Sequence, residues 1–304
     1  MKPEELTPSN YHSVEANQAF MSSHQWGKWC ECPARTYAEL AGAWDSGEKE
    51  AFLFGGYVDC ALLTPADLPE WYEDHKPAMI EVGLLKKGKT TLGDKGAKLI
   101  YADAMIQRAQ SDPAFMAALS GEPQRILTAE IDGVPWRIMV DSLDVEGRII
   151  TDLKTSKSIT KKAWFSRDDI FSTLEQTAGL HNYKGLYFDQ YNYFRQFAVY
   201  RTVAALNTKT PLMHWSLIMA TLSKEPPRDM NPTLDLYRGV DLELRSMNDE
   251  NALRYEMETI TNNLPQVMRW KRGEETPPMC GRCAFCTAHK RVGSPIPTRS
   301  EVWG

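Results

Sequence analysis

The fold of this chain is decided by one stretch, VDSLDVEGRIITDLK, which spans residues 140–154. A predicted strand from Val134 to Leu143 precedes the turn at Gly147, and a second predicted strand runs from Arg148 to Lys154. Side chains alternate between the two faces of a strand, so Asp152 and Lys154 share one face. The hairpin then brings Asp141 within reach of both.

Two carboxylates and a lysine in this arrangement have a clear chemical use. Hard oxygen ligands from Asp141 and Asp152 hold Mg²⁺, which keeps its remaining positions for water and a phosphate oxygen. The ion polarises the phosphate and lowers the pKa of a bound water. Lys154 would orient or deprotonate that water and stabilise the developing charge. A bare Asp-x-Lys is also typical of a surface ion pair at a strand end, and the residues alone leave that interpretation open.

The flanking sequence predicts a mixed sheet with helices. Strands are expected at 125–131, before the turn signal Asp132-Gly133, and at 214–222. Helices are expected at 22–44, 101–119 with a break near Pro113, 174–206, and 248–270 with an interruption at Pro265. Gly55-Gly56 is expected to open a new segment, 57–63.

The predicted fold class is therefore α/β (α+β), with a central mixed β-sheet flanked by helices. We expect one domain over 1–304. It would have a mainly helical part at 1–120, a sheet that carries the Asp141, Asp152 and Lys154 site with a bridging helix at 121–225, and a C-terminal helix with a cysteine cluster at 226–304.

Composition excludes several classes of protein. The 304 residues are 42% hydrophobic and 25% charged, as expected of a globular protein, and the net charge is −5. An acidic body can still bind DNA through a local basic groove. No apolar run approaches the ~20 residues needed to span a bilayer, and the acidic N-terminus lacks an apolar signal segment. We expect a cytoplasmic protein with no membrane contact.

Several ordered motifs resemble the PD-(D/E)XK nuclease superfamily. Asp141 followed by Asp152-Leu153-Lys154-Thr155 is similar to its core motif. The match is closest to phage and prophage exonucleases of the exonuclease VIII (RecE-like) type. Other similar segments are Asn10-Tyr11-His12, residues 32–40 with Gly42 and Trp44, and Gly55-Gly56-Tyr57-Val58-Asp59. Gln196 and Tyr200 match the Gln-x-x-x-Tyr helix motif of RecB-like nucleases.

The resemblance implies a role for each matching residue. Asp141 and Asp152 would bind Mg²⁺ or Mn²⁺ with the Leu153 carbonyl, and Lys154 would be the catalytic lysine. Gln196 and Tyr200, which share a helix face, would border the site and contact DNA, although an ordinary helix surface has the same spacing.

Two positions depart from the pattern of the family. RecB-like members often have a histidine where this chain has Asp59, whose carboxylate would bind metal or only form hydrogen bonds. The family also tends to have a glutamate on the strand before the hairpin. Glu122, Gln124 and Glu130 are the candidates here, so the number of bound metal ions stays open.

Six cysteines in a cytoplasmic protein are not expected to form disulfides. Three of them follow the pattern Cys280-x-x-Cys283-x-x-Cys286, which indicates a metal site. Some RecB-like nucleases complete a [4Fe–4S] cluster with one upstream cysteine, and Cys32 fits that place better than Cys30. The alternatives are zinc with His289 as the fourth ligand, or no metal. Cys60 is expected to be a small buried residue.

Basic residues after the catalytic strand are candidates for phosphate contacts. Lys157, Lys161 and Lys162 are the first of them. The lysines of the 86–89 loop are further candidates, but a solvated surface explains that loop equally well. Trp164, Phe165, Tyr191 and Tyr193 would stack on an unpaired DNA end, with core packing as the default.

The family implies a function for the chain as a whole. It would be a Mg²⁺-dependent exonuclease that processes duplex DNA ends, 5′ to 3′, in phage-type recombination, paired with a single-strand annealing protein. It would be encoded by a phage or prophage, and an oligomer is compatible with ring-forming relatives. The alternatives are a single-strand-directed iron–sulfur nuclease and a catalytically silent DNA-binding protein with this fold.

Overall fold

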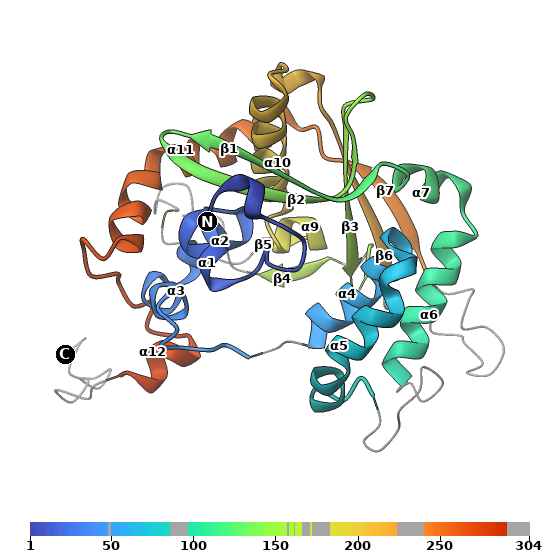
Figure 1. Cartoon of the computed structure of the whole chain (residues 1–304), viewed down its shortest axis with the longest axis horizontal. Helices are drawn as coiled ribbons and strands as arrows, with labels where there is room; N and C mark the ends of the chain where they lie inside the picture. The colour runs from blue at the N-terminus through green and yellow to red at the C-terminus, as the bar shows by residue number, and fades with distance from the viewer. Residues whose placement is uncertain are drawn as a thin grey trace, which may run out of the picture.

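The structure is a computed structural model that describes residues 1–47, 50–85, 97–156, 158–160, 162–165, 171, 183–223 and 240–290. Its centre is a five-stranded sheet in the order β1-β2-β3-β6-β7 (Figure 1). The strands are β1 (Glu122–Ile131), β2 (Val134–Asp144), β3 (Ile149–Ser156), β6 (Ser216–Ser223) and β7 (Leu242–Ser246). Only β3 and β6 are parallel among these neighbours; the other pairs are antiparallel. β4 (Ala163–Phe165) and β5 (Tyr183–Gly185) form a separate antiparallel pair.

The first hairpin forms where the sequence places a two-residue turn. Asp132 and Gly133 have φ angles of 49° and 74°, and positive φ at both positions is what a type I′ hairpin turn requires. Ile131 therefore pairs with Val134. β2 continues into the second hairpin, in which Ser142 lies opposite Thr151.

One face of the sheet is covered by α4 (Glu50–Leu63), α5 (Leu68–Glu81), α6 (Ala97–Gln110) and α7 (Pro113–Ala118). Leu153, Ala220 and Leu222 of the strands belong to the same buried cluster as these helices. Glycine allows α4 to pack closely, because a Cβ on Gly56 would lie 2.8 Å from Trp71 Cζ2.

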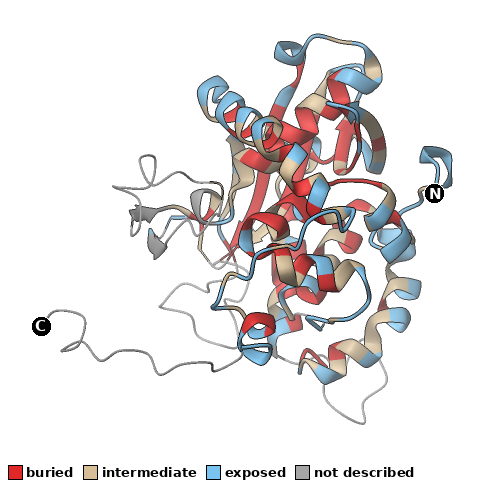
Figure 2. Ribbon diagram, turned by 90° about the vertical axis from the view of Figure 1, so that its left-hand side faces the viewer, coloured by how far each residue is buried: buried red, intermediate tan, exposed pale blue. Residues whose placement is uncertain are grey.

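The opposite face is covered by α10 (Tyr193–Thr208), α11 (Glu250–Lys271) and α2 (Ser23–Glu31). Trp26, Trp29 and Trp136 are fully buried there. Figure 2 shows buried residues concentrated between the layers and exposed residues along the outer helix surfaces. This is the face on which Asp152 and Lys154 lie.

Short elements complete the described chain: η1 (Pro3–Glu5), α1 (Val14–Ala19), α3 (Pro33–Leu40), η2 (Pro65–Asp67), α9 (Tyr187–Gln190), η4 (Leu212–His214) and α12 (Ala284–Ala288). Residue 21 extends the sheet, since Met21 N donates to Pro135 O at 2.8 Å and Arg137 N to Met21 O at 2.9 Å. This bridge anchors the N-terminal segment on β2, beyond the part of β2 that pairs with β3.

Some predicted element boundaries are wrong. The expected helix 22–44 is broken at Cys32, which has extended backbone, because a residue before proline avoids the helical region. Gly55 and Gly56 do not open a segment but lie inside α4. Pro265 does not interrupt α11, which continues to Lys271. The described part of the expected helix 174–206 contains β5 and a turn before α10 begins.

The predicted fold class is confirmed: a mixed sheet with helices on both faces. Every described element before residue 119 is helical, and the sheet reaches past residue 225 because it includes β7. None of the described helices has the length and apolar character needed to cross a membrane.

Candidate active site and cysteine cluster

Asp141, Asp152 and Lys154 meet on the α10-facing side of the sheet. Ser142 lies opposite Thr151 where the β2–β3 pairing ends, and Asp141 and Asp152 are the next residues on the two strands. The Leu153 amide donates to Asp141 Oδ2 at 2.7 Å. Lys154 Nζ lies 2.5 Å from Asp152 Oδ2. The Asp152 side chain is 1% exposed and that of Lys154 is 20% exposed. The pair is therefore largely buried, unlike the surface ion pair that the motif alone could also form.

Burial controls the charges of this group. It raises the pKa of Asp141 to about 7, with a further contribution from the neighbouring charge of Asp152. Burial also raises the pKa of Asp152. For Lys154, burial alone would lower the pKa, but Asp152 and Asp141 outweigh it and raise the pKa above the usual value. Two adjacent buried carboxylates fit a hard divalent cation, whose charge would relieve their repulsion.

Gln196 and Tyr200 of α10 border this group, as the motif predicts. Gln196 Nε2 lies 2.7 Å from Asp152 Oδ1, to which it donates, and 2.9 Å from the Tyr200 oxygen. Tyr200 is 7% exposed, and its hydroxyl donates to the Met139 carbonyl at 2.9 Å. Burial raises the pKa of Tyr200 well above its usual value, so it remains a neutral donor. The two residues connect Asp152 to the backbone of β2.

Tyr193 also belongs to the site, although the sequence predicted only stacking on DNA or core packing for it. Its ring centroid lies 5.3 Å from Lys154 Nζ, a distance typical of a cation–π contact. The signal in the sequence was helical spacing, since 193, 196 and 200 fall on one face of α10. Asp59 in α4 is half-buried, and its charge is one cause of the raised pKa of Tyr193. Its role as a metal ligand stays a prediction.

A polar network on β6 and β7 continues the same face. Thr221 pairs with Lys154 in the sheet register and with Glu243 on its other side. The Tyr187 hydroxyl bonds Glu243 and contacts Thr221 Oγ1 at 2.7 Å. No strand was predicted at β7, so this network could not be expected from the sequence.

The three β1 residues that are candidates for the glutamate position of the family lie at different places along the β1–β2 pairing. Pro123 pairs with Ser142 and Arg125 with Val140, which leaves Gln124 level with Asp141. Glu122 instead binds Arg125 at 2.8 Å on the surface, and Glu130 is exposed opposite Pro135. The residue nearest to the expected glutamate position is thus an amide.

The predicted phosphate-binding lysines are only partly described. Lys162 is exposed. Lys157, Lys161 and the lysines of the 86–89 loop lie outside the described residues. Their contact with DNA stays a prediction.

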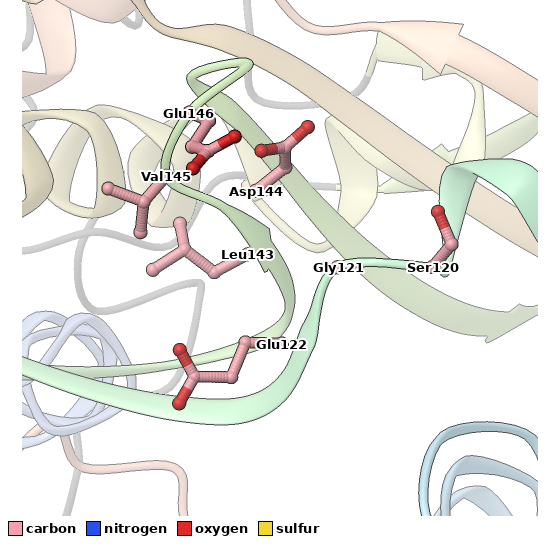
Figure 3. Close-up of a pocket in the computed structure, with 7 residues that line it drawn as sticks. All are labelled: Ser120, Gly121, Glu122, Leu143, Asp144, Val145 and Glu146. Carbon is pink, nitrogen blue, oxygen red and sulfur yellow. The ribbon is translucent and has the colours of Figure 1, made fainter.

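An open pocket of about 380 Å³ lies at the turn of the β2–β3 hairpin (Figure 3). It is lined by Glu122, Asp144 and Glu146, together with Ser120, Gly121, Leu143 and Val145. It contains neither Asp141 nor Lys154, and its acidic lining would repel a phosphate. We therefore do not assign it to the site.

The four cysteines predicted to share a metal come together. The Sγ atoms of Cys32, Cys280, Cys283 and Cys286 all lie within 4.8 Å of one another. Cys32, rather than His289, is therefore the fourth member, and His289 Nδ1 instead contacts the Phe285 carbonyl at 2.8 Å. Burial raises the pKa of Cys32 to about 12. Cys60 is buried, as predicted.

Comparisons with known proteins concern the family and the fold of the chain. A family model described as "PDDEXK-like domain of unknown function (DUF3799)" matches residues 22–289. A crystal structure described as a "Putative exonuclease" from Eubacterium rectale superimposes with a TM-score of 0.77 at 24% identity, and the match covers 99% of this chain and 98% of that one. At this identity the likeness shows a shared fold. A search of curated proteins found no match.

Proposed function

Because the chain belongs to the family of PDDEXK-like domains described as DUF3799, we propose that it is a divalent-metal-dependent DNA exonuclease. One observation carries the proposal: Asp141, Asp152 and Lys154 converge, largely buried, on one face of the sheet. A silent relative that kept only the fold would have no need to hold two carboxylates together at this energetic cost.

The two carboxylates would hold Mg²⁺ or Mn²⁺, with the Leu153 carbonyl as a further candidate ligand. Bound metal would polarise the scissile phosphate and lower the pKa of its water. In the metal-free site, Asp152 and Asp141 raise the pKa of Lys154. We propose that its ammonium group would stabilise negative charge that develops on the phosphate. Proton abstraction is the other role that the sequence left open for Lys154, and the metal-free pKa does not decide between the two.

Gln196 would orient Asp152 through its short hydrogen bond. Its partner Tyr200 is held by the Met139 carbonyl. Groups that fix the orientation of metal ligands typically change activity or metal affinity by about 10–100-fold. These two residues would therefore act by positioning rather than by direct contact with DNA.

The substrate and context follow from the resemblance to RecE-like exonucleases. We propose digestion of duplex DNA ends in the 5′ to 3′ direction, in the cytoplasm of a bacterial host, for phage-type recombination with a single-strand annealing protein. An oligomer is compatible with this proposal, which does not require one.

The first test is digestion of DNA labelled at either the 5′ or the 3′ end, as duplex and as single strand, with Mg²⁺, Mn²⁺ or EDTA. We expect early release of the 5′ label from duplex DNA and no digestion in EDTA. Early release of the 3′ label would reverse the polarity, and digestion confined to single strands would support the other nuclease candidate.

The second test is Lys154→Ala, for which we expect a loss of about 10²–10⁴-fold in cleavage with a normal fold and retained DNA binding. Lys76→Ala is the control, since Lys76 pairs with Glu73 on α5. Equal cleavage by Lys154→Ala and the parent would refute the catalytic assignment. DNA binding by the parent without cleavage under every metal condition would favour the silent DNA-binding protein.

A further inference from the structure

The cysteine cluster is built from two ends of the chain. Cys32 lies between α2 and α3, while Cys280, Cys283 and Cys286 surround the start of α12. Figure 1 places α3 and α12 next to each other at the lower left, away from β3. Cys32 and Cys286 are 0% and 3% exposed. Any ion held here would therefore join the N-terminal helices to the C-terminal segment.

The distances between the Sγ atoms indicate the size of the metal group that the four cysteines can hold. Cys32 Sγ lies 3.5 Å from Cys286 Sγ and 3.7 Å from Cys283 Sγ, and Cys280 Sγ lies 3.8 Å from Cys286 Sγ. Four thiolates around one tetrahedral zinc ion are separated by about 3.8 Å, because each Zn–S bond is about 2.3 Å. A disulfide requires a far shorter separation, about 2.05 Å.

A [4Fe–4S] cluster does not fit this spacing. Each of its four irons carries one cysteine thiolate on the outside of the cluster, so the whole inorganic core separates the thiolates. The sulfurs of Cys32 and Cys286 are instead in contact. The [4Fe–4S] group that the family resemblance implies therefore disagrees with the positions of the four Sγ atoms in this chain.

Backbone geometry also suits metal-bound thiolates. The amide of Cys283 points to Cys280 Sγ at 3.4 Å, and the amide of Cys286 to Cys283 Sγ at 3.5 Å. Gly281 has a φ of 77°, which favours glycine and closes the turn. Hydrogen bonds of this kind stabilise ligand sulfurs and orient them.

We propose that Cys32, Cys280, Cys283 and Cys286 bind a single Zn²⁺ ion that fastens the segment around α12 to α3. The four thiols would release their protons to solvent as the ion binds, with no change in oxidation state. Apolar packing here is small: besides the cysteines, the buried members of this cluster are Ala38 and Phe285. The ion supplies the stability that such a small core lacks.

The test is metal analysis of the full chain purified without oxygen or chelators. We expect one zinc per chain, no labile sulfide and a colourless protein. Cys286→Ser should lose most of the zinc, and Cys60→Ala, a buried cysteine outside the cluster, should keep it. Iron with labile sulfide, or equal zinc in Cys286→Ser and the parent, would overturn the proposal.

Hydrogen exchange tests the fastening role without relying on any variant. Removal of zinc with a thiol-reactive mercurial and a chelator should increase amide exchange in residues 280–289 and 32–38 by at least tenfold. Exchange in β2 and β3 should change little. Unchanged exchange around α12 after zinc removal would refute the role. None of these results depends on nuclease activity, so they are independent of the proposed function.

Discussion

At the scale of single residues, the site stores unfavourable electrostatic energy. Asp141 and Asp152 are both buried and lie side by side; burial raises the pKa of both, and the charge of Asp152 makes ionisation of Asp141 harder still. Lys154 compensates only in part, since the pKa of Asp141 remains raised to about 7. Functional sites commonly keep such unfavourable charges close together, at a cost in folding stability.

Asp141→Asn should therefore stabilise the metal-free protein while it abolishes cleavage. The folded pKa of Asp141, about 7, exceeds the unfolded value of about 4. Its contribution to stability is thus present at acidic pH and is lost as the pH rises through 7. Asparagine keeps an acceptor for the Leu153 amide and carries no charge. The gain in the free energy of unfolding at pH 8 should be on the order of 1–3 kcal/mol, measured by urea titration.

The gain should shrink at pH 5, where Asp141 is protonated in the folded protein. Asp144→Asn is the control, because Asp144 also accepts a backbone hydrogen bond, from Gly147, but lies outside the site. A variant Asp141→Asn that is less stable than the parent at pH 8 would contradict this account of the charges.

At the scale of elements, α10 supplies the support for the sheet-borne carboxylates. Tyr193, Gln196 and Tyr200 contact Lys154, Asp152 and the Met139 carbonyl from successive turns. The position of α10 on the sheet thus determines the geometry of the site, while the strands supply the reactive groups.

Gln196→Ala should lower cleavage by about 10–100-fold, the usual effect of removing a group that orients a metal ligand. The affinity for Mg²⁺ should fall as well, because Asp152 loses its hydrogen bond, while duplex DNA affinity measured with Ca²⁺ should change little. Asn207→Ala, at the exposed end of the same helix, is the control. A selective loss of DNA affinity with unchanged Mg²⁺ dependence would instead indicate direct contact with DNA.

At the scale of the whole molecule, a lysine joins the two ends of the described chain. Lys271, at the end of α11, donates to the Phe20 carbonyl at 2.9 Å and to Gln25 Oε1 at 3.0 Å. Burial, together with the charge of Arg137, lowers its pKa to about 7. The proposed zinc site would join the same two regions a second time.

Lys271→Met should reduce the increase in the free energy of unfolding that the parent shows between pH 7 and 10. In that range the unfolded chain holds the proton of Lys271, with a pKa of about 10.4, while the folded chain has released it. Folding is therefore favoured as the pH rises and loses this contribution as the pH falls toward 7. Thermal unfolding across the range should show a steeper slope for the parent and for the exposed control Lys2→Met. Parallel slopes for parent and Lys271→Met would contradict the burial of this charge.

The sequence by itself predicted strands β1, β2, β3 and β6, the helical stretches that contain α2, α6, α10 and α11, and the grouping of Asp141, Asp152 and Lys154. Strands β4, β5 and β7 and helices α4 and α5 were not predicted. Alternation, turn residues and the Asp132-Gly133 signal act between neighbours in the chain, so the hairpins and the shared face of Asp152 and Lys154 could be predicted. The resemblance to the Gln-x-x-x-Tyr motif predicted that Gln196 and Tyr200 act together, whereas their spacing alone is also that of an ordinary helix surface.

Only the tertiary structure decided which distant groups meet. It selected Cys32 over His289, placed Gln124 level with Asp141, and brought Tyr193 to Lys154. The tertiary structure also keeps Gly55 and Gly56 inside α4, because the packing of Gly56 against Trp71 outweighs the weak helix propensity of glycine. These outcomes depend on how layers pack and how strands register across long loops, which local patterns do not encode. The grouping of Asp141, Asp152 and Lys154 could therefore be predicted from residues 140–154 alone, whereas the residues that surround the trio are known only from the folded chain.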